Sequence, residues 1–134
     1  MRHTLRFAVG GLALLFIAGP AFAHHPFDSE FDSQAPLTLS GAVTRVDWSE
    51  PHVYVHVDVK DPSGQTRTWN FELASPAMLA RKGWSKDSLK QGETVTVKGY
   101  RAKSDPFVAT ARMIEMPNGK QLSSADEDDG GPKQ

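Results

Sequence analysis

The sequence predicts a mainly β protein with an OB-like barrel, five-stranded and partly open, and one short helix. Segments in which apolar and polar residues alternate, as in half-buried strands, occur three times before residue 75 and twice after residue 93. A short helix pattern separates the two groups. Three strands, a helix and two strands is the order of an OB fold, a partly open Greek-key barrel. The alternative is an open sheet covered by one helix.

The chain begins with the features of a secretory signal peptide, over residues 1–23. Two arginines precede an apolar run at residues 7–18, and Ala21-Phe22-Ala23 forms a small-x-small cleavage pattern. A retained membrane helix needs roughly 20 apolar residues, so this run is too short to stay as an anchor. We expect a periplasmic protein that is exported by a cleaved signal, begins at His24 and keeps no stable membrane anchor.

The composition of the rest of the chain bounds its function. Lys and Arg number 15 against 16 Asp and Glu, and two of the arginines belong to the signal, so the mature chain is acidic. Nucleic acid is therefore not an expected partner. The chain has no cysteine, which excludes disulfides and thiol chemistry. The remaining length suits one domain, divided into an N-terminal segment at residues 24–36, the barrel at 37–122 and a tail at 123–134.

Three strand patterns come first. Alternation from Leu37 to Thr44 is followed by a shift of phase, which predicts a β-bulge near Arg45. Four valines at alternate positions from Val53 to Val59 predict a strand with one face in the core. The third pattern, from Thr68 to Leu73, also alternates and predicts a half-buried strand.

A turn between the second and third strands sets their register. In Asp61-Pro62-Ser63-Gly64, proline presets a type I turn and glycine can take the left-handed conformation that closes a hairpin. Pairing Asp61 with Gln65 places apolar residues opposite apolar ones and polar residues opposite polar ones. The predicted pairs are Val57 with Trp69, Val55 with Phe71, His56 with Asn70, and Tyr54 with Glu72.

A helix and two strands follow. Ser75-Pro76 supplies an N-cap and a proline at the first helical position, and Gly83 ends the helix. Alternation from Thr94 to Arg101 and from Phe107 to Met116 predicts the fourth and fifth strands.

The end of the chain is predicted to leave the barrel. Asn118-Gly119 favours a hairpin turn before a short return strand that ends near Leu122. From Ser123 onward serine, glycine, proline and carboxylates dominate, and this composition predicts a disordered acidic tail.

Several motifs resemble a known family. They are His24-His25-Pro26-Phe27, Glu30-Phe31-Asp32, Gly41-x-Val43, Trp48-Ser49-Glu50-Pro51-His52-Val53, Trp69-x-Phe71-Glu72, Ser75-Pro76, Gly83-Trp84 and Gly92-x-x-Val95-x-Val97-x-Gly99. Together they resemble a family of small exported bacterial proteins of unknown function whose mature chains open His-His-Ser-Phe. Pro26, in place of serine, and the acidic tail depart from that pattern. The resemblance implies no established activity.

The histidines at the expected mature terminus are candidate metal ligands. After cleavage, His24 would offer an α-amine and an imidazole, and His25 a second imidazole. Such nitrogen donors favour Cu(II), and Zn(II) also binds imidazole. A third ligand could come from His52, His56 or a carboxylate, but four residues of extended strand separate the two histidines, so at most one of them can join His24. The alternative is a solvated terminus without metal, although Phe27 and Phe31 are placed to pack this segment onto the barrel.

A polar patch is the second candidate site. The predicted register places Tyr54, His56, Asn70 and Glu72 together on the outer face of the second and third strands. His56 and Glu72 are residue types that perform acid–base catalysis, but a solvated sheet face also requires such polar residues. No Ser-His-Asp spacing, phosphate loop, dinucleotide fingerprint or HExxH motif is present.

The first hypothesis is therefore a non-enzymatic periplasmic binding module that holds copper or another divalent metal. The second is a protein-interaction or envelope-stress module that binds an envelope protein and no metal. The third is a small enzyme that uses His56 and Glu72.

Overall fold

The computed structural model describes residues 26–133. The predicted signal peptide, the two candidate ligands His24 and His25, and Gln134 lie outside the described residues. Within residues 26–133, no helix has both the length and the apolar character needed to span a bilayer.

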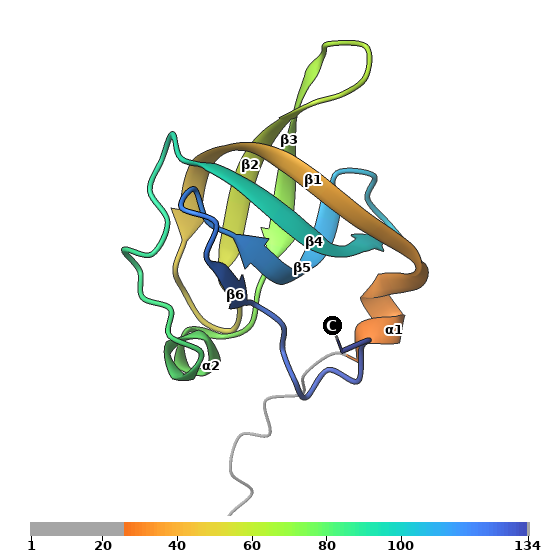
Figure 1. Cartoon of the computed structure of the whole chain (residues 1–134). Coiled ribbons are helices and arrows are strands. Elements are labelled where there is room, and N and C mark those ends of the chain that lie inside the picture. The colour runs from red at the N-terminus through yellow and green to blue at the C-terminus, as the bar shows by residue number, and fades with distance from the viewer. Residues whose placement is uncertain (1–25, 134) are drawn as a thin grey trace, which may run out of the picture.

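The strands form one sheet that closes on itself (Figure 1). Its order is β3-β2-β1-β4-β5-β6, and a parallel pairing of β3 with β5 completes a ring of five strands; all other neighbours are antiparallel. The predicted OB-like barrel is thereby confirmed, with β6 added at the edge of β5. The elements are α1 (Phe27–Glu30), β1 (Phe31–Asp47), β2 (Tyr54–Lys60), β3 (Thr66–Glu72), α2 (Pro76–Arg81), β4 (Thr94–Ala102), β5 (Val108–Glu115) and β6 (Gln121–Ser123).

The predicted register of β2 and β3 is confirmed at every pair. Val57 faces Trp69 and His56 faces Asn70, and the backbone N–H of Asp61 donates to the carbonyl of Gln65 over 2.9 Å. The predicted bulge in β1 is also confirmed, because its register against β2 shifts between residues 43 and 45. Turn chemistry and alternation agreed in the hairpin, and the shift of phase alone indicated the bulge, so local patterns predicted both features.

The core lies inside the ring and consists of inward residues from all five strands. Val53 and the three β2 valines, with Trp69 and Phe71 of β3, form its centre. The helix α2 closes one end: Ser75 Oγ accepts from the N–H of Met78 over 3.3 Å, as expected of an N-cap, and Leu79 is buried.

The N-terminal boundary of the barrel differs from the prediction. Residues 24–36 were expected to precede the first strand, but β1 already begins at Phe31, directly after α1. Pro36 and Leu37 pair with β4 opposite Tyr100 and Gly99. The polar stretch before Leu37 lacks apolar alternation, so it gives no strand signal although its backbone continues β1.

The acidic tail also differs from the prediction of disorder from residue 123 onward. In the structure, Ser124 and Asp126 are buried, and the Ser124 carbonyl accepts the N–H of Ala74 over 2.9 Å. The segment then runs from β6 to α1, as the dark blue trace in Figure 1 shows. Composition predicts how well a segment is solvated, but it does not reveal a buried cation elsewhere in the chain that the segment can neutralise. Here that cation is Arg112, which is 2% exposed.

Candidate functional site

Outward side chains form a continuous row across the barrel wall. Tyr54 of β2 lies opposite Glu72 of β3, Glu72 lies beside Thr110 of β5, and Thr110 lies opposite Tyr100 of β4. We call these four residues the outer row. The row exists because β3 and β5 pair in parallel and join the two halves of the barrel. Residues distant in sequence therefore lie at neighbouring positions on one surface.

Glu72 occupies the centre of a hydrogen-bonded group in this row. His52 Nδ1 lies 2.5 Å from Glu72 Oε1, and the Tyr54 hydroxyl donates to Glu72 Oε2 over 2.9 Å. The His52 and Glu72 side chains are 20% and 14% exposed. A carboxylate only accepts hydrogen bonds, so His52 Nδ1 is the donor. In the neutral ring the lone pair then belongs to Nε2.

The surroundings of His52 are negatively charged. The hydrogen bond that His52 donates to Glu72 raises the pKa of His52, burial opposes this shift, and the charges of Glu72, Asp126 and Glu30 reinforce it. Burial, followed by the nearby Glu72 charge, raises the pKa of Tyr54, so its hydroxyl stays protonated and keeps donating. The site therefore favours a proton or a metal cation over an anion.

His56 belongs to a second, separate group of side chains. Its Nδ1 lies 2.5 Å from Asn70 Oδ1, and its Nε2 lies 2.9 Å from Asp47 Oδ2 and 3.0 Å from an Arg45 nitrogen. The hydrogen bond from His56 lowers the pKa of Asp47. The four predicted patch residues thus share one face but divide into two groups, and His56 and Glu72 have different partners.

The segment that precedes β1 is fastened to the far end of the outer row. Phe27 is 2% exposed, and its ring packs edge-on against Tyr100 with 5.5 Å between centroids. Phe31, also buried, packs beside it at 5.7 Å. The expectation that Phe27 and Phe31 pack onto the barrel is confirmed. Tyr100 stands two strands away from Glu72, which at normal strand spacing is roughly 10 Å.

The described residues do not form a complete metal centre by themselves. Within residues 26–133, no group of three or more His, Asp or Glu side chains is arranged to hold a metal ion. Of the predicted ligands, only His52 lies in this part of the chain; His24 and His25 lie outside it. Any site that uses His52 therefore needs donors from elsewhere.

Comparison with known proteins gives a family. Residues 13–110 match a family of unknown function, DUF6152. The chain belongs to DUF6152. A search of curated proteins found no match. The DUF6152 match includes Phe27, His52 and the whole of β3, but it ends before Arg112 and the tail.

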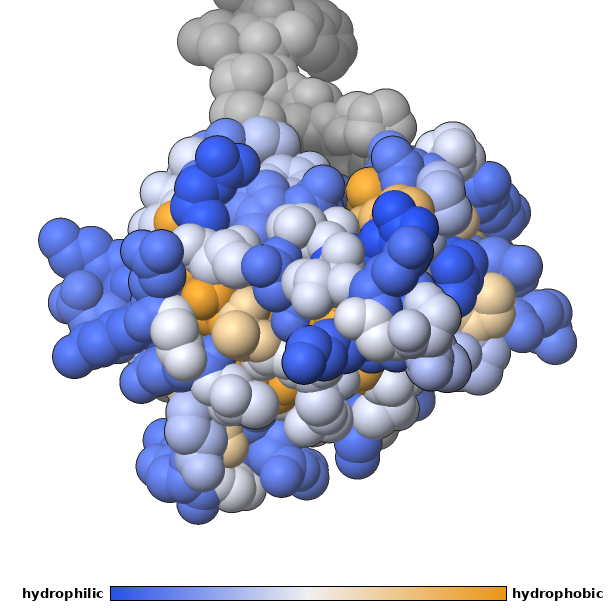
Figure 2. All heavy atoms as spheres, turned by 90° about the horizontal axis from the view of Figure 1, so that it is seen from above, coloured by the Kyte–Doolittle hydropathy of each residue, from blue (hydrophilic) through white to orange (hydrophobic). Residues whose placement is uncertain are grey.

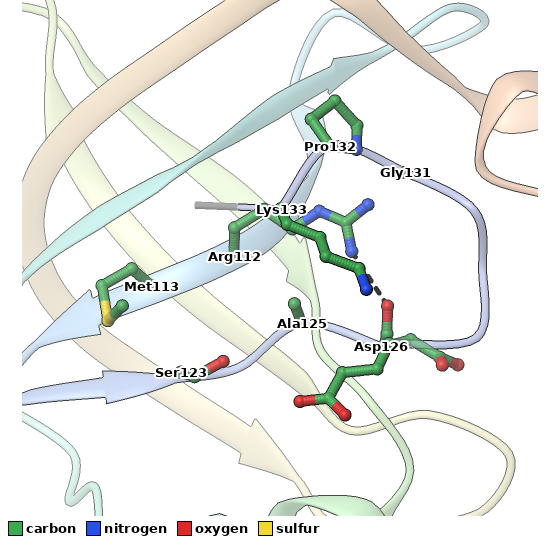
Figure 3. Close-up of a pocket in the computed structure, with 9 residues that line it drawn as sticks. Arg112, Met113, Ser123, Ala125, Asp126, Gly131, Pro132 and Lys133 are labelled. Carbon is green, nitrogen blue, oxygen red and sulfur yellow. Dashed lines mark hydrogen bonds between the residues drawn. The ribbon is translucent and has the colours of Figure 1, made fainter.

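The part of the chain beyond the DUF6152 match holds residues that the sequence did not single out. Arg112, Asp126 and the tail line a pocket of about 310 Å³, in which the arginine side chain points toward the tail (Figure 3). The only sequence signal at this place was a charged residue, Arg112, within the pattern of the fifth strand. That signal is weak, because an arginine on the outer face of a strand is usually solvated, and the sequence does not show that the tail covers it. A second pocket of about 330 Å³ lies near Met116 and Leu122. Neither pocket is lined by the outer row or by His56.

The surface around the β2–β3 hairpin is predominantly polar. Figure 2 views the molecule from that side and shows only small apolar areas between polar residues. Among residues 26–133, Phe107 is the single large hydrophobic residue that is exposed, and its ring contacts Trp69 and Arg67. This face therefore offers no broad apolar patch for a partner.

Proposed function

We propose that this chain is an exported, non-enzymatic binding module that holds a divalent metal ion, Cu(II) or Zn(II). Its ligands are His24 and His25 at the processed N-terminus and His52 on the barrel. The resemblance to small exported proteins and the signal pattern at residues 1–23 support export to the periplasm.

One observation carries the metal hypothesis: the hydrogen bond between His52 and Glu72. Histidines that bind metals commonly donate their other ring N–H to a carboxylate, which fixes the tautomer and makes the ligating nitrogen more basic. Glu72 accepts from His52 Nδ1, so Nε2 is the nitrogen that would bind. Tyr54 donates to the second carboxylate oxygen and fixes its orientation. We infer that Glu72 is a positioning residue and not itself a ligand.

The length of chain before Phe27 is sufficient for the other two proposed ligands to reach His52. Phe27 lies against Tyr100, roughly 10 Å along the outer row from Glu72. His25 precedes Phe27 by two residues, so the backbone between them spans up to about 7 Å, and His24 adds about 3.5 Å. The imidazole side chains extend this further. A segment of this length can bring its nitrogen donors to His52.

The donor types favour copper. A terminal amine and imidazole nitrogens suit Cu(II), which heads the affinity order of divalent first-row metals, and Zn(II) accepts imidazole with carboxylate. The negative charges of Glu30 and Asp126 near His52 would attract either ion. The enzyme hypothesis requires His56 and Glu72 to act together. Glu72 is instead hydrogen-bonded to His52, and His56 to Asn70 and Asp47, so a binding role fits better than acid–base catalysis by this pair.

Calorimetric titration with Cu(II) tests the proposal. The processed protein that begins at His24 is compared with a form that carries one extra alanine before His24, and with His52→Ala. We expect one tight site in the processed form, weaker binding in the extended form because its α-amine is displaced, and weaker binding in His52→Ala. Equal binding in the first two forms, or no binding in either, refutes the proposal.

The processing step has its own measurement. Mass spectrometry of protein recovered from the periplasm should give an N-terminus at His24. A mature chain that keeps Ala23, or that lacks His24, would not have the amine–imidazole chelate and would exclude this ligand set.

A further inference from the structure

We propose that the C-terminal tail is a clasp that positions the mature N-terminus at the metal site, with Arg112, Asp129 and Gly131 as positioning residues around Phe27. The inference rests on the proposed metal-binding function. It assigns a role to residues that lie beyond the family match.

The first part of the clasp is a buried ion pair. Arg112 Nη1 lies 2.9 Å from Asp129 Oδ2, and Nη2 donates to Asp129 Oδ1 over 3.1 Å, so the guanidinium meets the carboxylate through two nitrogens. Nη1 also donates to the carbonyl of Asp126 over 3.2 Å, the bond drawn in Figure 3. Both side chains are largely buried, at 2% and 13% exposure. Loss of either partner would leave an uncompensated buried charge.

The second part of the clasp is the contact of this ion pair with Phe27. The guanidinium carbon of Arg112 lies 4.8 Å from the centroid of the Phe27 ring, within the range of a cation–π contact. The backbone N–H of Phe27 donates to the carbonyl of Asp129 over 2.8 Å. The tail therefore holds Phe27 through both its ring and its backbone.

Gly131 allows this packing because it has no side chain. A Cβ at this position would lie 1.6 Å from Arg112 Nη2 and 2.5 Å from the Phe27 ring. The N–H of Gly131 also donates to Asp129 Oδ1 over 2.8 Å. Any larger residue would have to push apart the two groups that the clasp joins.

The tail can restrain Phe27 because it is itself fixed to the barrel at its start. The backbone carbonyl of Ser124 accepts from the N–H of Ala74, and the N–H of Ser124 donates to the backbone carbonyl of Arg112. Trp84 Nε1 donates to the carbonyl of Ser123 over 2.8 Å. The segment from Ser124 to Asp129 thus links the barrel wall to Phe27, two residues after His25.

Fixing Phe27 has a direct consequence for metal binding. A ligand held near its site binds at a high effective concentration, which raises affinity without any new contact to the ion. An unfastened N-terminal segment would still chelate metal through its own amine and imidazoles, but it would recruit His52 less often. The clasp should therefore control whether His52 joins the metal, in addition to stabilising the fold.

Two variants and a matched control test this inference. Asp129→Asn removes the charge that neutralises Arg112, and Gly131→Ala introduces the clash without changing any charge. Glu127→Gln is the control, because Glu127 lies in the same tail and loses the same charge, but its side chain is exposed and pairs with Lys82 instead of Arg112. Amide exchange of Phe27 in the metal-free protein measures anchoring, and exchange of the core amide of Val57 verifies that each variant is folded.

We expect the Phe27 amide to exchange about a hundredfold faster in both variants and at an unchanged rate in Glu127→Gln, while the Val57 amide stays strongly protected in every variant. The affinity for Cu(II) should fall about tenfold in the same two variants. At saturating copper, their visible absorption and electron paramagnetic resonance spectra should shift toward those of His52→Ala. A general loss of stability would not reproduce that spectrum.

The outcomes separate this inference from the proposed function. Unchanged exchange at Phe27 in both variants refutes the clasp, whatever the metal data show. Faster exchange with an unchanged Cu(II) affinity and spectrum refutes the positioning role and leaves the metal site standing. Absence of Cu(II) binding in the unsubstituted protein refutes the proposed function and, with it, the role of the clasp in metal binding. In that case the amide exchange of Phe27 still decides whether the tail anchors this residue.

Discussion

The substitution Glu72→Gln tests the structural basis of the metal hypothesis even without metal. Glutamine has nearly the same shape, and its one carbonyl oxygen can still accept from Tyr54, but it no longer offers a charged acceptor to His52. A hydrogen bond to a charged group contributes about 1.5–3 kcal/mol. The two side chains keep some exposure, so we expect a loss of about 1–2 kcal/mol in the free energy of unfolding near pH 6.

The size of this loss should depend on pH in a definite direction. The pKa of His52 is raised by Glu72 above its ordinary value of 6.5. A raised pKa in the folded state means that the folded protein holds the proton more tightly than the unfolded chain does. The ion pair therefore contributes fully below about pH 6.5, and this contribution is lost as pH rises through the folded pKa. The difference between Glu72→Gln and the unsubstituted protein should accordingly shrink near pH 9.

Urea unfolding in the presence of a chelator, at both pH values, measures this difference. Glu115→Gln is a matched control, because Glu115 loses the same charge on an exposed part of β5 where its partner is Gln121. A difference that stays constant or grows at the higher pH would contradict the assigned pairing. With Cu(II) present, loss of a carboxylate that orients a ligand should lower the affinity by about 10–100-fold.

Two further predictions concern other parts of the barrel. Gly99→Ala should lower the free energy of unfolding by at least about 1–3 kcal/mol, measured by urea unfolding. The reason is that a Cβ there would lie 1.8 Å from the carbonyl oxygen of Thr110 and push β4 away from β5. A smaller loss of unfolding free energy would show that the two strands can separate at little cost. Asp47 should titrate below its ordinary pKa of 3.8 when followed by NMR, and its pKa should return toward that value in His56→Phe. The stability from this pair is therefore present above pH 3.8 and is lost as the pH falls through the folded pKa of Asp47. An unchanged titration of Asp47 in the variant would refute the pairing.

The sequence predicted the barrel because its local patterns agreed with one another. In β2 and β3 the alternation, the Asp61 turn and the pairing of like residues all favour a single register, and that register is present. The same reasoning placed Tyr54 beside Glu72 and His56 beside Asn70. It did not show that these four residues form two groups, because the partners that divide them, His52 and Asp47, lie outside the two strands.

The tail and the N-terminal segment could not be predicted for a different reason. Neither has an apolar period, and each is held by a contact with a residue far away in sequence: Phe27 with Asp129, and Asp129 with Arg112. Composition describes how a segment interacts with water, and a buried ion pair depends on geometry that composition does not contain. Phe27 and Phe31 were the informative exception, because two aromatic residues in a polar segment indicate that it packs against something.

The position of His52 and Glu72 follows from how the two halves of the barrel wall meet. The outward residues of β2 and β3 are polar and face solvent, while α1 covers Tyr100 of β4 and the tail covers Arg112 of β5. Glu72 lies at the border, with Tyr54 on the solvated side and Thr110, which is buried, on the covered side. Partial burial strengthens its interaction with His52, because charges interact more strongly where water is displaced, yet both side chains keep some exposure to solvent, as the proposed metal site requires. In the proposed function, α1 and the tail would therefore both shape the surroundings of His52 and anchor the segment that carries the other two ligands.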